Sequence, residues 1–225
     1  RPGKLDHPEA HAEGPPNDDG RPPVVIRGSF GVRLRMGDRF VSRNFLMYLI
    51  DSHAHLHFPA FNADIDEVVK RAQENDIGLV TVGTKFSLSE SGVAFAERYE
   101  NVWATIGLHP GHVHDHNFVD ENEESNDVPT PEKTFDEERY ASLVTHPKVV
   151  AIGEFGLDYS RVPEGMDVEV FKNDQREVAR QQLRFATKYQ KPVVIHCRDA
   201  HDDMRALIAE EIARGGIARR GVIHC

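Results

Sequence analysis

The feature that most limits the fold of this chain is a regular alternation of short apolar runs with helical patterns. The runs follow Met47 and are MYLIDS, IGLVTVGT, VWATIGL, VVAIGEF, PVVIHC and GVIHC. Continuous apolar runs of this length are typical of parallel strands that are buried on both faces. Their alternation with helices predicts a parallel α/β sheet, either doubly wound or closed into a (β/α)8 TIM barrel.

Three segments between the runs carry apolar residues at the helical spacing of three and four. These residues are Ile65, Val68, Val69 and Ala72 in the first segment, Ala179, Leu183 and Ala186 in the second, and Met204, Leu207, Ile208 and Ile212 in the third. Pro192 follows the second segment and Gly215 the third, where each residue favours the end of a helix. Residues 114–133 are acidic and poor in apolar residues, which predicts a mobile loop.

The first run favours a barrel over a dinucleotide-binding sheet. A dinucleotide-binding sheet needs a glycine-rich turn after its first strand, and here the first run ends in His53-Ala54-His55. In a barrel, catalytic side chains lie at the C-terminal ends of several strands. We therefore expect an incomplete (β/α)8 barrel with about six of its eight strands.

Residues 1–46 differ from the rest of the chain. Residues 1–23 are rich in proline, glycine and charge and lack periodicity, which predicts disorder. Residues 24–44 have some strand-like alternation and a basic bias. We expect a disordered or non-native extension at 1–46, dispensable for the fold, and a partial barrel domain at 47–225. A basic arm or targeting peptide is the alternative, although the acids within residues 1–20 argue against a transit peptide.

Composition narrows the classes of function. The net charge of −10 argues against a broad surface that binds duplex DNA. No apolar run approaches the roughly 18–20 residues of a membrane span, and the two cysteines do not form a disulfide framework. We expect a cytoplasmic protein with no membrane partner and no obligate protein partner. Its 13 histidines are the first indication of metal chemistry.

Side chains that commonly bind metals follow four of the runs. They are His53 and His55 after the first run, Glu154 in the fourth, His196 in the fifth and His224 in the sixth. A single such residue is more often a hydrogen-bonded core histidine, but four strand ends that converge on one barrel mouth indicate a metal. Neutral imidazoles and a carboxylate suit zinc, manganese or a similar ion, and a carboxylate can bridge two ions.

The two cysteines offer a rival site, because His-Cys pairs can hold structural zinc. The tripeptide Ile-His-Cys occurs twice, at Cys197 and at Cys225. Adjacent residues of a strand point to opposite faces. If His196 and His224 face the barrel interior, both cysteines face the helices and are packing residues.

The motifs IDSHAHLHF, VWATIGLHPGH, VVAIGEFGLDY, PVVIHCRDA and GVIHC, in this order, closely resemble those of the TatD-type metal-dependent deoxyribonucleases of the amidohydrolase superfamily. The resemblance runs from Met47 to Cys225 and implies that residues 47–225 are a partial metal-dependent hydrolase domain of the TIM-barrel class. It implies a (β/α)8 barrel with two divalent metal ions (Zn, Mn or Mg) that activate water. The implied reaction is hydrolysis of DNA phosphodiester bonds by a 3′–5′ exonuclease, with single-stranded DNA or 3′ ends as the substrate.

The resemblance also implies roles for individual residues. His53, His55 and Glu154 would hold one metal ion, and Glu154, His196 and His224 the other, so that Glu154 bridges the two. His109, in GLHP, is a family motif position that could steady a phosphate oxygen or donate a hydrogen bond behind the ligands; a structural role before Pro110 is the alternative.

Arg198 is a second candidate for contact with a phosphate, because the guanidinium fork suits that geometry. The alternative for Arg198 is a surface ion pair with Asp199 or Asp202.

One part of the family pattern is absent. The family has a further metal-ligating aspartate at the end of its eighth strand, whereas this chain stops after the sixth run. Without the last two strands, the strands that carry His53 and His224 become exposed edges. We expect the chain as written to be poorly soluble or loosely packed and without nuclease activity, holding one metal weakly through Glu154, His196 and His224.

Two other functions stay open at this point. An amidohydrolase-type metalloenzyme that acts on a C–N or ester bond would use the same site. An inactive fragment, or an interaction protein that kept the barrel, is the third possibility, and the intact set of ligands argues against it.

Overall fold

The computed structural model describes residues 33–36, 39–42, 49–114, 134–217 and 221–224. The chain divides into two units, residues 1–49 and residues 50–225, and each is described by itself. In the first unit, β1 (Arg33–Met36) and β2 (Arg39–Ser42) pair antiparallel as a two-stranded sheet. This sheet lies within the extension for which the sequence predicts disorder. The rest of residues 1–46 lies outside the described residues, so the disorder and dispensability of the extension stay predictions.

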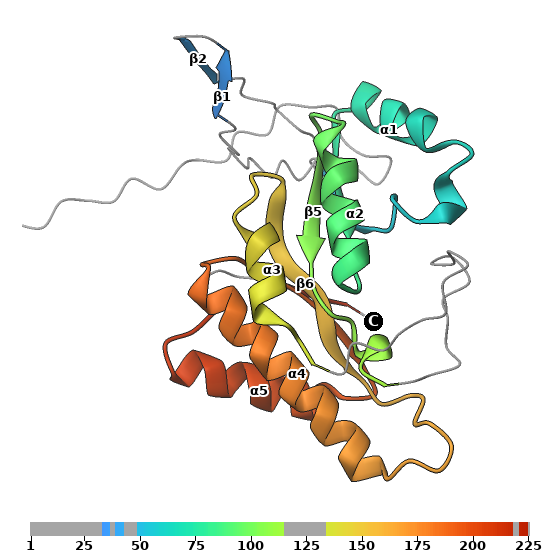
Figure 1. The fold of residues 1–225 in the computed structure, drawn as a ribbon, viewed down its shortest axis with the longest axis vertical. Helices are drawn as coiled ribbons and strands as arrows, with labels where there is room; N and C mark the ends of the chain where they lie inside the picture. The colour runs from blue at the N-terminus through green and yellow to red at the C-terminus, as the bar shows by residue number, and fades with distance from the viewer. Residues whose placement is uncertain (1–32, 37–38, 43–48, 115–133, 218–220, 225) are drawn as a thin grey trace, which may run out of the picture. The chain divides into compact units, whose positions relative to one another are not determined.

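The second unit is built on six parallel strands that form a half-barrel (Figure 1). In chain order they are β3 (Leu49–Ala54), β4 (Ile77–Val82), β5 (Val102–Ile106), β6 (Val149–Asp158), β7 (Val193–Arg198) and β8 (Val222–His224), and they neighbour one another in that same order. Each strand corresponds to one of the six apolar runs. The predicted fold class, an incomplete barrel of six strands, is therefore confirmed.

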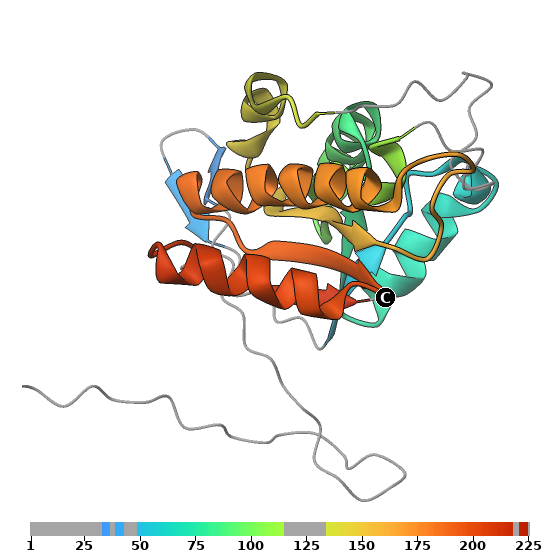
Figure 2. The same cartoon turned by 90° about the horizontal axis from the view of Figure 1, so that it is seen from below.

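Helices connect the strands and pack against the sheet. They are α1 (Ile65–Glu74), α2 (Phe86–Glu97), α3 (Glu137–Val144), α4 (Val168–Lys188) and α5 (His201–Ala213), with short 3-10 turns at η1 (Pro59–Phe61) and η2 (Pro110–His112). Figure 2 shows α4 and α5 side by side, where α4 contacts β6 and α5 contacts β7. The helical spacing of the sequence predicted α1, α4 and α5.

Helix α2 was not predicted, because its sequence has no simple apolar stripe. Its buried residues include two small ones, Ser89 and Gly92. The Ser89 hydroxyl accepts a hydrogen bond from the Gly107 amide at 3.2 Å. Close approach to the sheet, rather than a wide hydrophobic face, thus fixes α2.

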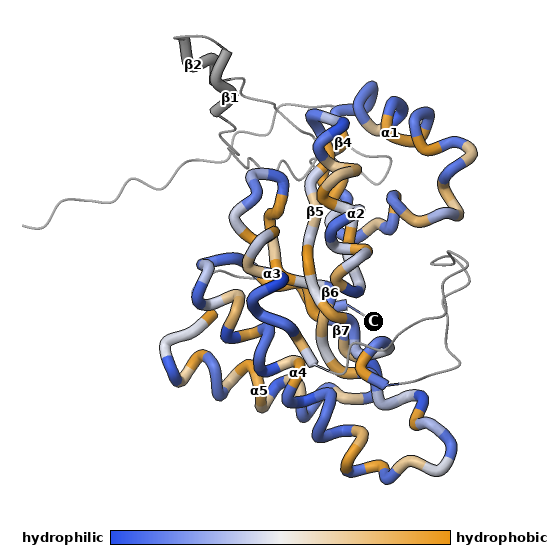
Figure 3. The backbone as a smooth tube through the Cα atoms, viewed as in Figure 1, coloured by the Kyte–Doolittle hydropathy of each residue, from blue (hydrophilic) through white to orange (hydrophobic). Residues whose placement is uncertain are grey.

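The core lies between the sheet and the helices. Figure 3 shows apolar residues along β5 and β6, and the largest fully buried side chains include Tyr140, Phe155, Phe171 and Phe185. One residue departs from its predicted place: Ile212, in the apolar series of α5, is 57% exposed. It lies in the last turn of α5, near Ala213.

The two outermost strands of the sheet are β3 and β8, the strands that carry His53 and His224. Their apolar side chains are exposed, as expected for edges: Ile50 is 36% exposed, Val222 43% and Ile223 58%.

Two other features complete the description. In the described part of the chain, no helix combines the length and the apolar character that a membrane span requires. The acidic loop predicted at 114–133 lies, except for His114, outside the described residues.

Strand β6 approaches β7 unusually closely around Glu154. Gly153 and Gly156 have φ angles of +147° and +155°, in a region that side chains disfavour. A Cβ on Gly153 would lie 2.3 Å from the Val194 carbonyl oxygen, and one on Gly156 would lie 1.9 Å from the His196 carbonyl oxygen. Only glycine at these two positions lets β6 place Glu154 beside His196.

We predict that Gly156→Ala destabilises the domain by about 2 to 5 kcal/mol, since it combines backbone strain with overpacking against the β7 backbone. The matched control is Gly165→Ala, where φ is also positive (+79°) but no atom lies within 4 Å of the added Cβ. Strain alone acts there and costs about 1 to 2 kcal/mol. Urea unfolding of both variants measures the difference, and equal losses would contradict the close approach.

Candidate metal centre

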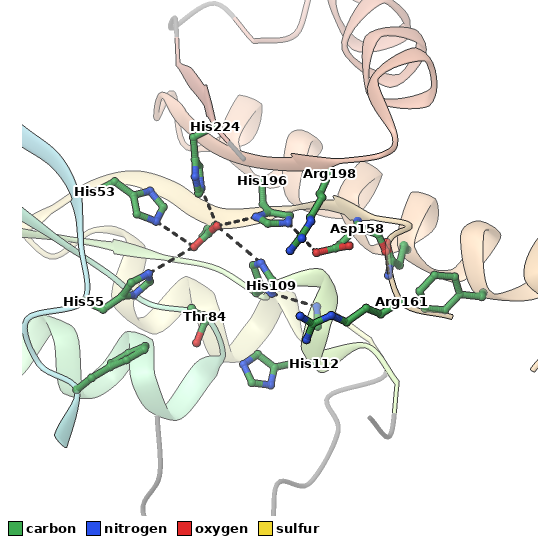
Figure 4. A pocket seen from close by; sticks show the side chains of 15 residues that line it. His53, His55, Thr84, His109, His112, Asp158, Arg161, His196, Arg198 and His224 are labelled. Carbon is green, nitrogen blue, oxygen red and sulfur yellow. Dashed lines mark hydrogen bonds and ion pairs between the residues drawn. The ribbon is translucent and has the colours of Figure 1, made fainter. Parts of the chain in front are cut away.

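The carboxylate of Glu154 lies at the centre of the pocket. Glu154 belongs to the C-terminal half of β6 and is only 4% exposed. Figure 4 shows His53, His55, His109, His196 and His224 arranged around one carboxylate. Its Oε1 lies 2.7 Å from His224 Nε2 and 3.1 Å from His196 Nδ1. Its Oε2 lies 3.2 Å from His53 Nε2 and 3.8 Å from His55 Nε2. The structure therefore brings all five sequence-predicted metal ligands together.

Curvature of the sheet closes this ring of side chains. His53 comes from the first strand of the half-barrel and His224 from the last, yet the centroids of their rings are 3.9 Å apart. Parallel strands present their carboxyl ends at one edge, and a curved sheet turns that edge into a mouth. Ligands from opposite edges can therefore meet over Glu154.

The imidazoles stabilise the ionised form of Glu154. Burial by itself would raise the pKa of this carboxyl group, but hydrogen bonds from His196, His224 and His53 outweigh burial and hold the pKa far below its usual range. The carboxylate is therefore anionic at neutral pH and available to a cation.

His55 and His109 are held in opposite tautomers by the backbone. His55 Nδ1 lies 3.0 Å from the Val82 carbonyl oxygen, which can only accept, so Nδ1 donates and the lone pair of Nε2 faces Glu154. His109 Nδ1 instead accepts from the Gly111 amide at 3.0 Å. In the neutral His109 ring the proton is then on Nε2, which lies 3.7 Å from Glu154 Oε1. This arrangement favours His55 as a ligand and His109 as a hydrogen-bond donor.

His196 lies between two carboxylates. Its Nδ1 faces Glu154, and its Nε2 lies 3.0 Å from Asp158 Oδ2. Burial lowers the pKa of His196, but the hydrogen bonds to Asp158 and Glu154 outweigh it and raise the pKa to about 9. Burial would raise the pKa of Asp158, and the hydrogen bonds from His196 and Ser160 hold it below its usual range.

The donor set fits a divalent metal ion, because imidazole nitrogens around a buried carboxylate are a ligand set typical of zinc or manganese. Ligand atoms of His53, Glu154 and His224 lie within 4.8 Å of one another, as do those of His109, Glu154 and His196. This grouping differs from the two sets implied by the family resemblance, in which His55 accompanies His53 and His224 accompanies His196.

The pocket around Glu154 has a volume of about 250 Å3. Its lining includes residues that the sequence analysis did not single out, namely Phe58, Thr84, His112, Asp158, Arg161, Phe171 and Gln175. Asp158 and Arg161 could have been suspected, because they follow Glu154 closely on the same strand end. Thr84 and Gln175 carry no such signal, since a polar residue after β4 or within α4 is ordinary.

Arg198 also lines the pocket, at the C-terminal end of β7. Within the described part of the chain Arg198 makes no ion pair, and Asp202 pairs instead with Arg205 at 3.1 Å. The ion-pair alternative for Arg198 therefore has no support among the described residues.

Two other sequence-predicted details concern side chains outside the pocket. His57, the third histidine of the first motif, turns away from the site, and its Nδ1 lies 2.7 Å from the Thr81 hydroxyl. Cys197 is buried and forms no disulfide within the described residues, in keeping with a packing role. Cys225 lies outside the described residues.

Comparison with known proteins agrees with this fold. The family described as "TatD related DNase" matches residues 50–225. The chain belongs to this family. The six-stranded half-barrel described above is therefore part of a TatD-family fold.

Relatives of the chain include both uncharacterised and named enzymes. It is 33% identical over 178 residues to the "uncharacterized metal-dependent hydrolase YabD" of Bacillus subtilis, covering 79% of this chain and 60% of the relative. It is 35% identical over 169 residues to the "3′-5′ ssDNA/RNA exonuclease TatD" of Cronobacter sakazakii, covering 73% and 54%. The chain thus spans little more than half the length of these relatives.

A solved structure is also similar. The TatD-family hydrolase of Entamoeba histolytica superposes with a TM-score of 0.55 at 25% identity, covering 79% of this chain and 57% of that protein.

The raised pKa of His196 predicts a pH-dependent stability in the metal-free protein. The folded state binds the His196 proton more tightly than the unfolded state, whose pKa is about 6.5. The contribution of this proton to the free energy of unfolding is about 1 to 3 kcal/mol. It is fully present below about pH 6.5 and is lost as pH rises through about 9. The lowered pKa values of Glu154 and Asp158 affect stability in a different pH range. Their contribution to the free energy of unfolding is lost only as pH falls below about 4.

The measurement is urea unfolding between pH 6 and 10 in the presence of a chelator, for the wild type and for His196→Gln. We expect the wild type to lose its advantage over the variant across this range. Parallel stability curves would contradict the predicted proton binding.

Proposed function

We propose that this protein is a DNA phosphodiesterase of the 3′–5′ exonuclease type, with two divalent ions, Zn, Mn or Mg, held around Glu154. The observation that carries the proposal is the ring of imidazoles about one buried, anionic carboxylate. The exonuclease names of TatD relatives support a nucleic-acid substrate. A cytoplasmic location, expected from the sequence, belongs to the same proposal.

The residues divide into two sets around a bridging carboxylate. We assign His53, His55 and Glu154 to one ion, and Glu154, His196 and His224 to the other. The two oxygens of Glu154 support this division, because Oε2 faces His53 and His55 while Oε1 faces His196 and His224.

The metal ions supply the electrophilic chemistry: when bound, they lower the pKa of water and stabilise negative charge on phosphate oxygens. The chain's own residues orient the substrate. His109 presents its Nε2 proton to the pocket because Gly111 occupies Nδ1, so His109 can donate to a phosphate oxygen. Arg198 can pair with a phosphate at the rim of the pocket.

A net charge of −10 is compatible with DNA binding only at a small site that contacts one or two phosphates. An acidic protein repels the long, dense charge of duplex DNA. A pocket with cations at its base can still bind the phosphate of a single strand or a strand end. We therefore propose single-stranded DNA or 3′ ends as the substrate.

The substrate class is tested with a panel. The 225-residue chain and a version completed to eight strands are incubated with manganese or magnesium and with 5′-labelled or 3′-labelled single-stranded DNA. We expect the completed version to shorten DNA from the 3′ end and the 225-residue chain to be nearly inactive. Hydrolysis of small amides or esters, with DNA left intact, would instead favour an amidohydrolase acting on a C–N or ester bond.

The bridging role of Glu154 predicts a hierarchy of metal affinities. In the completed version, Glu154→Ala should lower metal affinity by at least about 100-fold, because it removes a ligand common to both ions. His57→Ala is the matched control, since His57 belongs to the same cluster of motif histidines but turns to Thr81. Its effect should stay below about threefold.

The measurement is competition with a chromophoric chelator, and Glu154→Gln repeats the test without a cavity. Equal losses for Glu154→Ala and His57→Ala would show that Glu154 is not a bridging ligand.

A further inference from the structure

Asp158 is the second carboxylate of the pocket. Among the described residues that line the pocket, Glu154 and Asp158 are the acidic ones. Both belong to β6, four positions apart, and the His196 ring lies between them. Asp158 Oδ2 is 3.0 Å from His196 Nε2, and Glu154 Oε1 is 3.1 Å from His196 Nδ1.

This geometry bears on the tautomer of His196. A neutral imidazole carries one proton, and the nitrogen that binds a metal must offer its lone pair. Glu154 is the carboxylate at the centre of the ligand ring, so a metal bound there faces Nδ1 of His196. The proton must then be on Nε2, and Asp158 Oδ2 lies in position to accept it.

Asp158 is itself held firmly. Its Oδ1 accepts hydrogen bonds from the Ser160 amide at 3.0 Å and from the Ser160 hydroxyl at 2.5 Å. The buried side chain of Gln175 holds the backbone on both sides, accepting from the Asp158 amide at 2.8 Å and donating to the Asp158 carbonyl at 3.1 Å. With Oδ1 and the backbone fixed, Oδ2 stays directed at His196.

His196 differs in this respect from His55. The second nitrogen of His55 donates to a neutral backbone carbonyl, that of Val82. A carboxylate partner raises the basicity of an imidazole ligand more than a carbonyl does, because it stabilises the positive charge that the ring gains on binding a cation.

We propose that Asp158 is a positioning residue that holds His196 in the Nε2-protonated tautomer, so that Nδ1 is presented to a metal ion shared with Glu154. The proposal rests on the metal centre proposed above. In this role Asp158 acts through His196 and is not itself a metal ligand. Removal of the Asp158 side chain is therefore expected to weaken metal binding without removing a ligand. The proton of His196 should then no longer be fixed on Nε2.

The test uses the 225-residue chain with zinc alone and compares Asp158→Ala, Asp158→Asn and the wild type. Zinc affinity is measured by chelator competition, and the protonation of His196 by long-range 1H–15N correlation spectra of the imidazole. We expect Asp158→Ala to lower zinc affinity by about 10- to 100-fold. In zinc-free samples at a pH well above 9, where the His196 ring is neutral, we also expect Asp158→Ala to shift the proton from Nε2 towards Nδ1, because Glu154 is then the remaining carboxylate that faces the ring.

Asp158→Asn provides the rescue. Its amide oxygen can still accept from His196 Nε2, so the tautomer should be largely retained and the loss of affinity should be smaller than for Asp158→Ala. If Asp158→Ala fails to fold, Asp158→Asn is compared with Asp158→Leu instead. Leucine is similar in size to asparagine but cannot accept a hydrogen bond, so only Asp158→Leu should lose the effect of Asp158 on His196.

Asp203→Asn is the matched control for loosening of the structure. Asp203 accepts hydrogen bonds from Tyr159, the residue next to Asp158, and from Arg176, and it contacts no pocket histidine. It should change neither zinc affinity nor the His196 spectrum. An Asp158→Ala variant with wild-type affinity and tautomer would overturn the proposal, as would a wild type that binds no zinc.

The two proposals fail in different ways. If the completed protein binds zinc but leaves DNA intact, the proposed nuclease function fails while the tautomer measurement still supports Asp158. If DNA is cleaved while Asp158→Ala leaves the His196 signals unchanged, the role of Asp158 fails alone.

Discussion

The arrangement of this domain depends on one buried carboxylate. Glu154 is almost fully enclosed, and an anion in such a place is stable only when it is surrounded by hydrogen-bond donors or cations. Imidazoles from β3, the loop after it, β7 and β8 provide that surrounding. The imidazoles that stabilise this buried anion are also side chains that commonly bind metal ions. The stability of Glu154 and the metal-binding character of the pocket therefore have the same source.

The scaffold meets this requirement through curvature and close approach of strands. The half-barrel turns far enough for His53 on its first strand to contact His224 on its last, although neither strand pairs with the other. Next to Glu154, the absence of a side chain at Gly153 and Gly156 lets β6 lie against the backbone of β7. Backbone groups then fix the tautomers of two histidine rings. The Val82 carbonyl and the Gly111 amide select opposite tautomers for His55 and His109, which favours His55 as a metal ligand and His109 as a hydrogen-bond donor.

Much of the fold could be predicted because its signals are local. Buried parallel strands are continuous apolar runs, and α1, α4 and α5 show helical periodicity, so the strand order and class of the sheet followed from the sequence. Helix α2 could not be predicted, since the partners that bury Ser89 and Gly92 are distant in the sequence: the Gly107 amide for Ser89 and the His57 ring for Gly92. The exposure of Ile212 was missed for the related reason that periodicity does not reveal where the packing partner of a helix ends.

The sequence by itself determined which residue types stand at the strand ends, and therefore that His53, His55, Glu154, His196 and His224 meet in one pocket. Only the tertiary structure decided how they meet: which oxygen of Glu154 faces which ring, that His57 turns to Thr81, and that Asp158 lies against His196. The physical reason is that strand periodicity fixes the face from which a side chain emerges. The hydrogen-bond partner of each ring nitrogen depends on backbone and side-chain atoms far away in the sequence, which only the folded sheet brings within 3 Å or so.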